Sequence, residues 1–505
     1  PAASQILVIG GGPGGSYAST VLAREGFKVT LLERDVYHIG ESLLPSCRPF
    51  LRFIGAEELV SNHGFAEKPG AAVKLNQYKR EGYTDFISLN RDNGAWNVLR
   101  SEFNELLLRH AAVCGVTVCE GVRVTKINFD DANTPVSADW ETKDGENTGT
   151  ISFDYLVDAS GRQGIMSTRY LRNRHVNVSL RNQACWGYWR GTKMYAPENF
   201  SNRNNAPWFE ALTGKTIYFN QAWFIPLHNG TTSVGVVLTE EASIAKKRAL
   251  RDGTLKDHYL EQLKLAPGLV RLLGDGELVT DIKSAGDYSY SATHYAGSRY
   301  RLVGDAAVFS SGVHLAFTGA LSAASSIAAS IKQQCSESEA ITFHNAKVGI
   351  SYTRFLLVVL GIYKQIRAQE SAVLSDVDED NFDRAFVFLR PGATSADADS
   401  KLTEKELQDT MDFCKNIFAP TNPLMHAQVA KRLGPELTSP DAPIMGVAAV
   451  MTLAGNDENA KHVLLEVNAR KPIHVMYDAD VNFTTEVMGG FCVRMQKGNL
   501  GLVRA

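Results

Sequence analysis

The chain opens with a short aliphatic run at residues 6–9 (ILVI), which leads directly into a cluster of glycines. A run of this length and type predicts a buried parallel strand. The next residues have the apolar spacing of a helix, and a second apolar run at 28–32 ends at Glu33. The order of strand, glycine turn, helix and strand predicts the start of a doubly wound α/β domain, whose ligand lies at the carboxyl ends of the strands.

The glycines between the first strand and the helix complete the pattern G-x-G-x-x-G. The first glycine permits a tight turn, the second lets backbone approach a pyrophosphate, and the third lets the helix pack on the strand. An acid about 20 residues further on is placed to bind a ribose hydroxyl. The pattern therefore predicts a site for NAD or FAD rather than a simple glycine turn. The predicted residues are Gly10, Gly12, Gly14, Gly15, Glu33 and Arg34.

Two later apolar runs distinguish these cofactors. Residues 155–162 (YLVDASGR) predict a strand and a tight turn, and residues 300–305 (YRLVGD) predict a strand that ends at Asp305. With Arg100 in NVLRSEFNELL, they resemble the dispersed FAD motifs of the aromatic hydroxylase superfamily, the group A flavin monooxygenases. The resemblance implies that Asp305 meets the ribityl–pyrophosphate region and that Arg100 lies near the pyrophosphate. Without the resemblance, Arg100 is typical of a solvated helix face.

Three further segments resemble flavin-dependent halogenases, especially the fungal group that acts on phenolic polyketides. They are YHIGESLLPS at 37–46, GAAVKLNQYKREGYTDF at 70–86 and QAWFIPLHNGTTSVGVV at 221–237. The chain departs from the family pattern at two places: Gln221 replaces the first tryptophan of W-x-W-x-I-P, and the loop before Tyr37 is a few residues shorter. The residues carried over are Gly40, Glu41 and Ser42 for FAD, Lys74 for catalysis, and Trp223, Ile225 and Pro226 for the tunnel.

The resemblance implies a reaction. Reduced FAD and O2 form a C4a-hydroperoxide, which converts chloride (or bromide) to hypohalous acid, and Lys74 delivers the acid to an electron-rich carbon of a phenolic or enolic secondary metabolite. Apolar neighbours predict that Lys74 lies on a buried strand, where a lysine is costly. The alternative is an edge strand from which its amine reaches water.

The segment VFSSGVHLAFTG, which begins at residue 308, is the expected halide loop. The resemblance implies that backbone amides at Ser311 and Gly312 bind the halide and that Val313 lies beside the flavin. An anion at a helix start is favoured by free amides and the helix dipole. The alternative is an ordinary helix cap by a serine. His314 has no evident partner in the sequence and is interpreted as a packed or capping histidine.

Composition limits the possible partners. The net charge of −3 gives no reason to expect nucleic acid. The seven cysteines form no C-x-x-C pair, so neither a disulfide framework nor a metal site is predicted. The apolar stretches are too short for a membrane span, and no signal peptide is recognised, so a cytoplasmic protein is expected. A second G-x-G-x-x-G after a strand is missing, so either NAD(P)H binds transiently, as in the hydroxylases, or a separate NAD(P)H-dependent flavin reductase supplies the reduced flavin, as the halogenase resemblance implies.

The 505 residues predict two or three domains of mixed α/β class. We expect a Rossmann-like FAD-binding domain from 1–69, 96–180 and 285–340, a substrate domain with a β-sheet from 70–95 and 181–284, and a mainly helical C-terminal region at 341–505. The sequence favours a halogenase. An aromatic monooxygenase (hydroxylase) shares every FAD motif and stays open, as does a non-catalytic FAD-binding protein.

Overall fold

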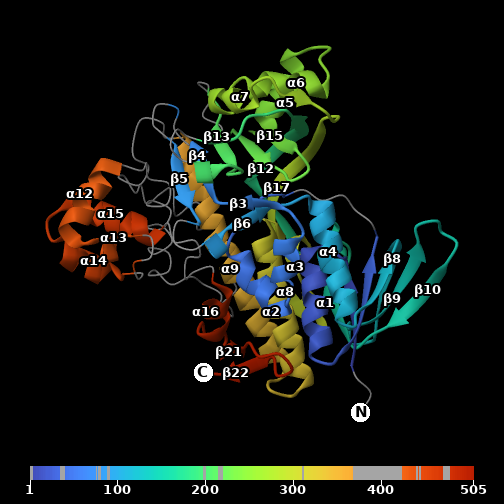
Figure 1. Ribbon diagram of the computed structural model, residues 1–505. Helices are drawn as coiled ribbons and strands as arrows, with labels where there is room; N and C mark the ends of the chain where they lie inside the picture. Colours follow the sequence, from blue (N-terminus) through green and yellow to red (C-terminus); the bar gives the residue numbers. More distant parts are fainter. Residues whose placement is uncertain are drawn as a thin grey trace.

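The computed structural model describes residues 4–34, 40–74, 77, 81–87, 91–196, 201–213, 220–309, 312–367, 423–439, 442, 445–469 and 478–505. Two β-sheets of different kinds dominate it, a six-stranded sheet surrounded by helices and a nine-stranded sheet above it (Figure 1). This mixed helix and strand content is the α/β class that the alternation of apolar runs predicts.

The six-stranded sheet is parallel except at one edge. In spatial order its strands are β18 (Ala296–Gly297), β19 (Tyr300–Leu302), β11 (Tyr155–Asp158), β1 (Gln5–Ile9), β2 (Lys28–Glu33) and β7 (Thr117–Glu120). The residues that follow β1, β2, β11 and β19 therefore meet at one edge, where open α/β sheets bind ligands. A separate antiparallel sheet is formed by β8 (Val122–Phe129), β9 (Pro135–Thr142) and β10 (Thr148–Ser152).

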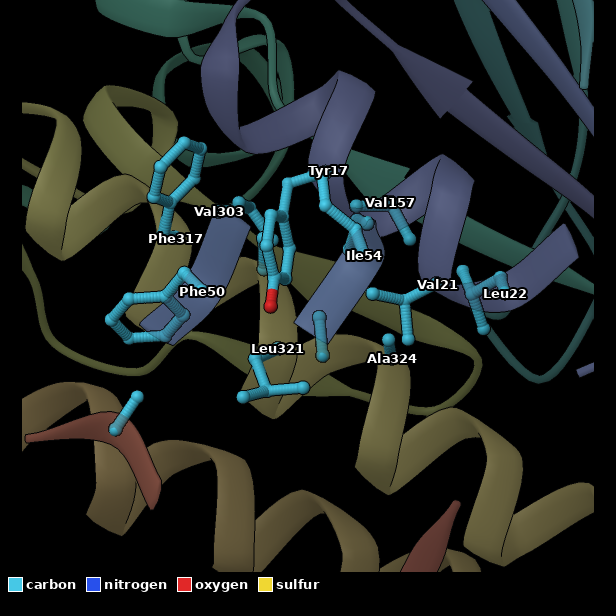
Figure 2. Close-up of a cluster of buried hydrophobic side chains, with 14 of the residues drawn as sticks. Tyr17, Val21, Leu22, Phe50, Ile54, Val157, Val303, Phe317, Leu321 and Ala324 are labelled. Carbon is cyan, nitrogen blue, oxygen red and sulfur yellow. The ribbon is translucent and has the colours of Figure 1, made fainter. Parts of the chain in front are cut away.

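The core of this half lies between the sheet and three helices, α1 (Pro13–Arg24), α4 (Arg100–Val113) and α8 (Gly312–Ile331). Figure 2 shows Tyr17 of α1 among aromatic and aliphatic side chains of α2 (Cys47–Ile54) and α8. The Tyr17 ring lies 4.9 Å from that of Phe317 and 5.9 Å from that of Phe50, measured between centroids. This packing fixes the start of α1 relative to α8.

The length and apolar character of helix α8 differ from what the sequence predicts. Among the described residues it is long and apolar enough to cross a membrane, although the sequence was expected to hold no such stretch. Its small and apolar residues pack tightly, and 94% of its most apolar window is buried inside the protein. We therefore interpret α8 as a core helix.

The nine-stranded sheet is mostly antiparallel and carries helices on one face. Its main path is β20 (Val308–Phe309), β17 (Lys283–Ala292), β12 (Arg174–Arg190), β15 (Thr231–Thr239), β14 (Gln221–Pro226), β13 (Trp208–Ala211), β4 (Gly70–Lys74) and β5 (Gly82–Asp85), with β16 (Glu277–Leu278) paired to β12. Helices α5 (Glu240–Ala249), α6 (Leu255–Leu263) and α7 (Pro267–Leu273) lie beside it (Figure 1). The expected domain boundaries near 180 and 285 fall inside β12 and β17, because these long strands run from one half into the other.

The described C-terminal part is mainly helical. Its elements are α9 (Glu337–Arg367), α12 (Pro423–Leu433), α13 (Pro435–Thr438), α14 (Val447–Ala454), α15 (Glu458–Ala469), α16 (Ala479–Thr484), β21 (Phe491–Arg494) and β22 (Gly501–Arg504). The Glu25 carboxylate after α1 accepts hydrogen bonds from the amides of Gly498 (2.7 Å) and Leu500 (2.9 Å). This buried carboxylate fastens the last residues of the chain to the first helix.

Candidate flavin site

The turn between β1 and α1 has no room for side chains at two of its glycines. Gly10 has a φ of +101°, and a Cβ there would lie 2.3 Å from the carbonyl oxygen of Ala159. A Cβ on Gly15 would lie 1.8 Å from the carbonyl oxygen of Gly10. Both positions require glycine, the first for its backbone conformation and the second for close packing of helix on strand.

Gly12 and Gly14 have different surroundings. Gly14 packs on the strand side, where an added Cβ would meet Val303 at 2.9 Å. Gly12 caps α1 with a φ of −65°, and a Cβ built there meets nothing within 4 Å among the described residues. The helix start therefore faces open space, as a pyrophosphate-binding turn needs.

Glu33 ends β2 and lies against the same turn. Its Oε2 accepts a hydrogen bond from the amide of Gly11, so the carboxylate is beside the glycines, as the spacing predicts. Arg34 follows and reaches in the other direction, since its Nη1 donates to Oε1 of Gln163 at 3.3 Å. That glutamine belongs to the predicted turn after β11, so the two segments meet at the carboxyl edge of the sheet.

Arg100 and Gly40 are in contact although 60 residues separate them. Arg100 is the first residue of α4, is 9% exposed, and donates from Nη1 to the carbonyl of Gly40 at 3.1 Å. The interpretation of Arg100 as a solvated helix-face arginine is therefore wrong. Ser42 forms an isolated β-bridge with Asn97, the last residue of β6 (Ala95–Asn97). The segment 40–42 is thus attached to the chain that leads into α4.

Glu41 connects this segment to the nine-stranded sheet. Its Oε1 accepts a 2.5 Å hydrogen bond from the hydroxyl of Tyr188 on β12, and it also bonds Ser233 on β15. Ser233 Oγ in turn accepts a hydrogen bond from Trp223 Nε1 at 3.2 Å. Burial raises the pKa of the Glu41 carboxyl, and the two hydroxyl donors oppose this rise. The G-E-S and W-x-I-P segments therefore belong to one hydrogen-bonded cluster.

Two of the predicted tunnel residues, Trp223 and Ile225, lie on the face of the sheet that carries this cluster. The Trp223 indole lies flat over β15, where a Cβ on Gly235 would be 2.2 Å from its Cζ2 atom. Ile225 is buried and pairs with Ser233, and Pro226 ends β14 opposite Thr232. Because successive residues of a strand point to opposite faces, Trp223 and Ile225 share one face of β14, whereas Pro226 points to the other.

Asp305 lies where the sequence predicts, one turn after β19 in the short helix Gly304–Ala306. Its backbone carbonyl accepts hydrogen bonds from the hydroxyl of Tyr290 (2.7 Å) and from Arg174 (3.3 Å). This helix packs against α8, so Asp305 and the start of α8 occupy neighbouring positions.

These residues fit FAD. The open helix start at Gly12, the acid beside it, and the buried Arg100 fastened to Gly40 provide places for the ribose and pyrophosphate. The buried hydroxyl of Ser42 has no hydrogen-bond partner among the residues that the structure describes, which leaves a donor for a ligand at this segment.

Comparison with known proteins agrees with this site. Residues 3–346 match a protein family described as FAD binding domain. Flavin-dependent halogenase armH1 of Armillaria mellea is 61% identical over an alignment that covers all of this chain and 99% of that protein. This chain is a flavin-dependent halogenase.

Solved structures agree in fold. The myxobacterial chondrochloren halogenase CndH has a TM-score of 0.66 and 26% identity, with coverage of 84% of this chain and 99% of CndH. An aklavinone-11 hydroxylase complex also shares the fold, with a TM-score of 0.55, 18% identity and coverage of 73% and 70%. The armH1 alignment spans 523 positions, so at least 18 of them have no residue in this 505-residue chain. The short loop before Tyr37 is one place where the sequence predicts such a gap.

Lys74 of this halogenase is half-buried at the end of β4. Strand β4 lies between β13 and β5, so the edge-strand alternative is wrong. Successive residues of a strand point to opposite faces. Ala72 packs toward α6 and α7, whereas Val73 packs in the cluster that includes Trp223. By this alternation Lys74 shares the helix-covered face of Ala72 and not the face of Trp223 and Ile225.

Lys68 is a second lysine, which sequence reasoning missed. It ends β3 (Ala66–Lys68), is 3% exposed, and donates from Nζ to the carbonyl of Leu43 at 2.7 Å. Burial lowers the pKa of its amine to about 7. Leu43 directly follows the G-E-S residues, so Lys68 lies beside the flavin segment. A three-residue strand has no readable periodicity, and no pattern marked this lysine as buried.

Of the expected halide loop the structure describes Val308–Phe309 and the residues from Gly312 onward, whereas Ser311 lies outside the described residues. Gly312 has a φ of +55° and starts α8, and a Cβ added to it meets nothing within 4 Å among the described residues. Val313 and His314 are buried behind it, and burial lowers the pKa of His314 to about 4. His314 is therefore a neutral, packed histidine at neutral pH.

Gly12 has open space beside it, whereas Gly15 has no room for a side chain, so substitutions at the two positions should have different effects. Gly12→Ala should leave the apoprotein as stable as the wild type but weaken FAD binding, because the new methyl group occupies the space before α1. Gly15→Ala should lower the stability of the apoprotein itself by about 1–3 kcal/mol, because it forces the turn apart. Urea unfolding of the apoproteins and FAD titration by flavin fluorescence measure the two effects. Unchanged FAD affinity in Gly12→Ala would exclude the helix start as the pyrophosphate site.

Proposed function

We propose that this halogenase uses FADH2 and O2 to halogenate an electron-rich carbon of a phenolic or enolic secondary metabolite of polyketide type. We propose chloride as its preferred halide and bromide as the alternative. The observation that carries the proposal is the cluster in which Glu41 and the tunnel residue Trp223 share Ser233. This cluster brings the two segments that resemble phenol halogenases to one wall beside the flavin site.

In this proposal the protein binds the flavin and the halide at separate positions. Reduced FAD and O2, when bound, supply the oxidising equivalent that turns halide into hypohalous acid. Gly10–Gly15, Glu33, Arg100 and Asp305 would hold the cofactor. Backbone N–H groups at Ser311 and Gly312 would bind the halide, with the dipole of α8 directed at it and Val313 beside it.

We propose Lys68 as the amine that delivers the halogen, and Lys74 as the alternative. Lys68 is supported by its burial, its contact with Leu43 and its lowered pKa. A neutral amine can attack the chlorine of hypochlorous acid: the N–Cl bond forms, the Cl–O bond breaks, and the hydroxide takes the extra ammonium proton to give water. The aromatic carbon then takes chlorine from nitrogen as the N–Cl bond breaks, and the nitrogen takes up one proton as the ring carbon loses one, which restores the amine.

The reduced flavin would come from a separate NAD(P)H-dependent reductase, because the sequence holds one dinucleotide-type glycine motif. The rival function is hydroxylation, since a hydroxylase of known structure shares the fold. The two functions differ in their need for halide and for an added reductase.

The test is a reconstituted reaction with FAD, NADH, a flavin reductase, O2 and chloride over a panel of phenols and 1,3-diketones. We expect products with the chlorine isotope pattern, and none when the reductase or halide is omitted; a bromide reaction gives the halide preference. Rapid reduction of bound FAD by NAD(P)H alone, with addition of one oxygen atom to the phenol, would support the hydroxylase.

Matched variants distinguish the roles of Lys68 and Lys74. Lys68→Met should keep FAD binding and NADH consumption but lower product formation by about 100-fold or more, the usual effect of removing one essential group. Lys74→Met should keep most of the activity. Lys68→Arg should not restore activity, because a guanidinium stays protonated. The opposite pattern in the same mass-spectrometric assay would assign delivery to Lys74.

The pKa of Lys68 predicts a pH profile. Its value falls from an ordinary 10.5 to about 7, so the amine is protonated and without a lone pair below that pH and becomes available above it. The halogenation rate should therefore rise with pH through about 7 when reduced flavin is in excess. The residual activity of Lys68→Met should lack this rise. A rate that is flat or that falls between pH 6 and about 8 would contradict a neutral-amine step.

A further inference from the structure

Two histidines and a glutamate from separate parts of the chain converge outside the flavin site. His63 follows α3 (Glu57–Asn62), Glu102 lies in the first turn of α4, and His228 lies in the turn between β14 and β15. Glu102 Oε2 is 2.9 Å from His63 Nε2 and 3.1 Å from His228 Nε2. The three ligand atoms all lie within 4.8 Å of one another.

The two imidazole rings are held by one aromatic side chain. Phe65 is buried, and its centroid is 4.2 Å from that of His63 and 5.4 Å from that of His228. The ring of Phe65 also meets Phe103 on α4, next to Glu102. Neighbouring packing therefore orients both histidines toward the same carboxylate oxygen, which is how a ligand set is prepared in advance.

We propose that His63, Glu102 and His228 bind a divalent transition-metal ion of the zinc class. Zinc takes imidazole nitrogen and carboxylate oxygen at about 2.0–2.2 Å, and two such ligands at a tetrahedral angle lie about 3.4 Å apart. The two histidine–glutamate separations need to open by a few tenths of an ångström to accommodate the ion. Two imidazoles favour zinc over magnesium or calcium, which prefer oxygen ligands. All three side chains retain some exposure, so water can take the fourth position.

The three ligands adjoin the segments that build the active site. His63 is five residues before Lys68, Glu102 is two residues after Arg100, and His228 is two residues after Pro226. A bound ion would therefore fasten the lysine segment, the start of α4 and the end of β14 to one point. It would act as a structural clamp and is not placed in the halogenation steps.

The test uses the FAD-loaded protein and zinc alone. After treatment with chelator, titration calorimetry should find one zinc ion per chain, Co²⁺ should give a visible absorption spectrum, and Mg²⁺ and Ca²⁺ should not bind. His63→Ala, His228→Ala and Glu102→Gln should each weaken zinc binding by about 100-fold or more, at least as much as outer-shell changes at known sites. Zinc should raise the Tm of the wild type by a few degrees and leave that of the variants unchanged.

Two controls address folding and competing sites. His175→Ala removes an exposed histidine elsewhere, and Cys114→Ser removes a thiol whose sulfur is 3.7 Å from His110 Nε2. Both should bind zinc like the wild type. FAD stoichiometry confirms that each variant is folded. The proposal is overturned if the wild type binds no stoichiometric zinc, or if the three ligand variants bind it as tightly as the wild type does.

Discussion

The segment of residues 40–43 is held by hydrogen bonds from three directions, and it joins the helix-covered six-stranded sheet to the nine-stranded sheet. Arg100 of α4 bonds the Gly40 carbonyl, Tyr188 of the nine-stranded sheet bonds the Glu41 carboxylate, and Lys68 bonds the Leu43 carbonyl. The six-stranded sheet carries the glycine turn, whereas the nine-stranded sheet carries Trp223 and Ile225. The segment 40–43 thus helps to fix the position of Trp223 relative to the glycine turn.

The contacts around residues 40–43 bury polar and charged groups, which costs folding free energy but permits only a specific arrangement of partners. A carboxylate, a guanidinium and an amine lie close together with little exposure, and each loses hydration that hydrogen bonds must replace. For Glu41 the replacement is incomplete, since burial still raises its pKa despite two hydroxyl donors. For Lys68 burial lowers the pKa to about 7, and the hydrogen bond to the Leu43 carbonyl does not compensate the loss of water. The poor solvation that costs stability therefore leaves part of the Lys68 amine neutral near neutral pH.

Much of the flavin half could be predicted from the sequence, because its signals are local. The positions of Gly10, Gly15 and Glu33 follow from a strand, a turn and a spacing that few other structures share. Arg100 needed the family resemblance, since its burial results from a contact 60 residues away. Lys68 could not be found, because its three-residue strand is buried by neighbours from distant segments. The apolar neighbours of Lys74 predicted a buried strand, but they do not indicate which face of the sheet its side chain occupies.

Gln221 replaces the first tryptophan of the W-x-W-x-I-P signature. It changes the sheet face that carries Trp223 but not the contacts of residues 40–43. Gln221 pairs with Ala211 and Val237, so it lies on the face that carries Trp223, two residues along β14. The second tryptophan keeps its bond to Ser233 and its place over Gly235. A glutamine in place of an indole fills less of the space above a buried alanine and adds a hydrogen-bond donor and acceptor. The contacts that join Trp223 to the flavin segment are thus retained, while position 221 presents a smaller and more flexible polar side chain than a tryptophan would.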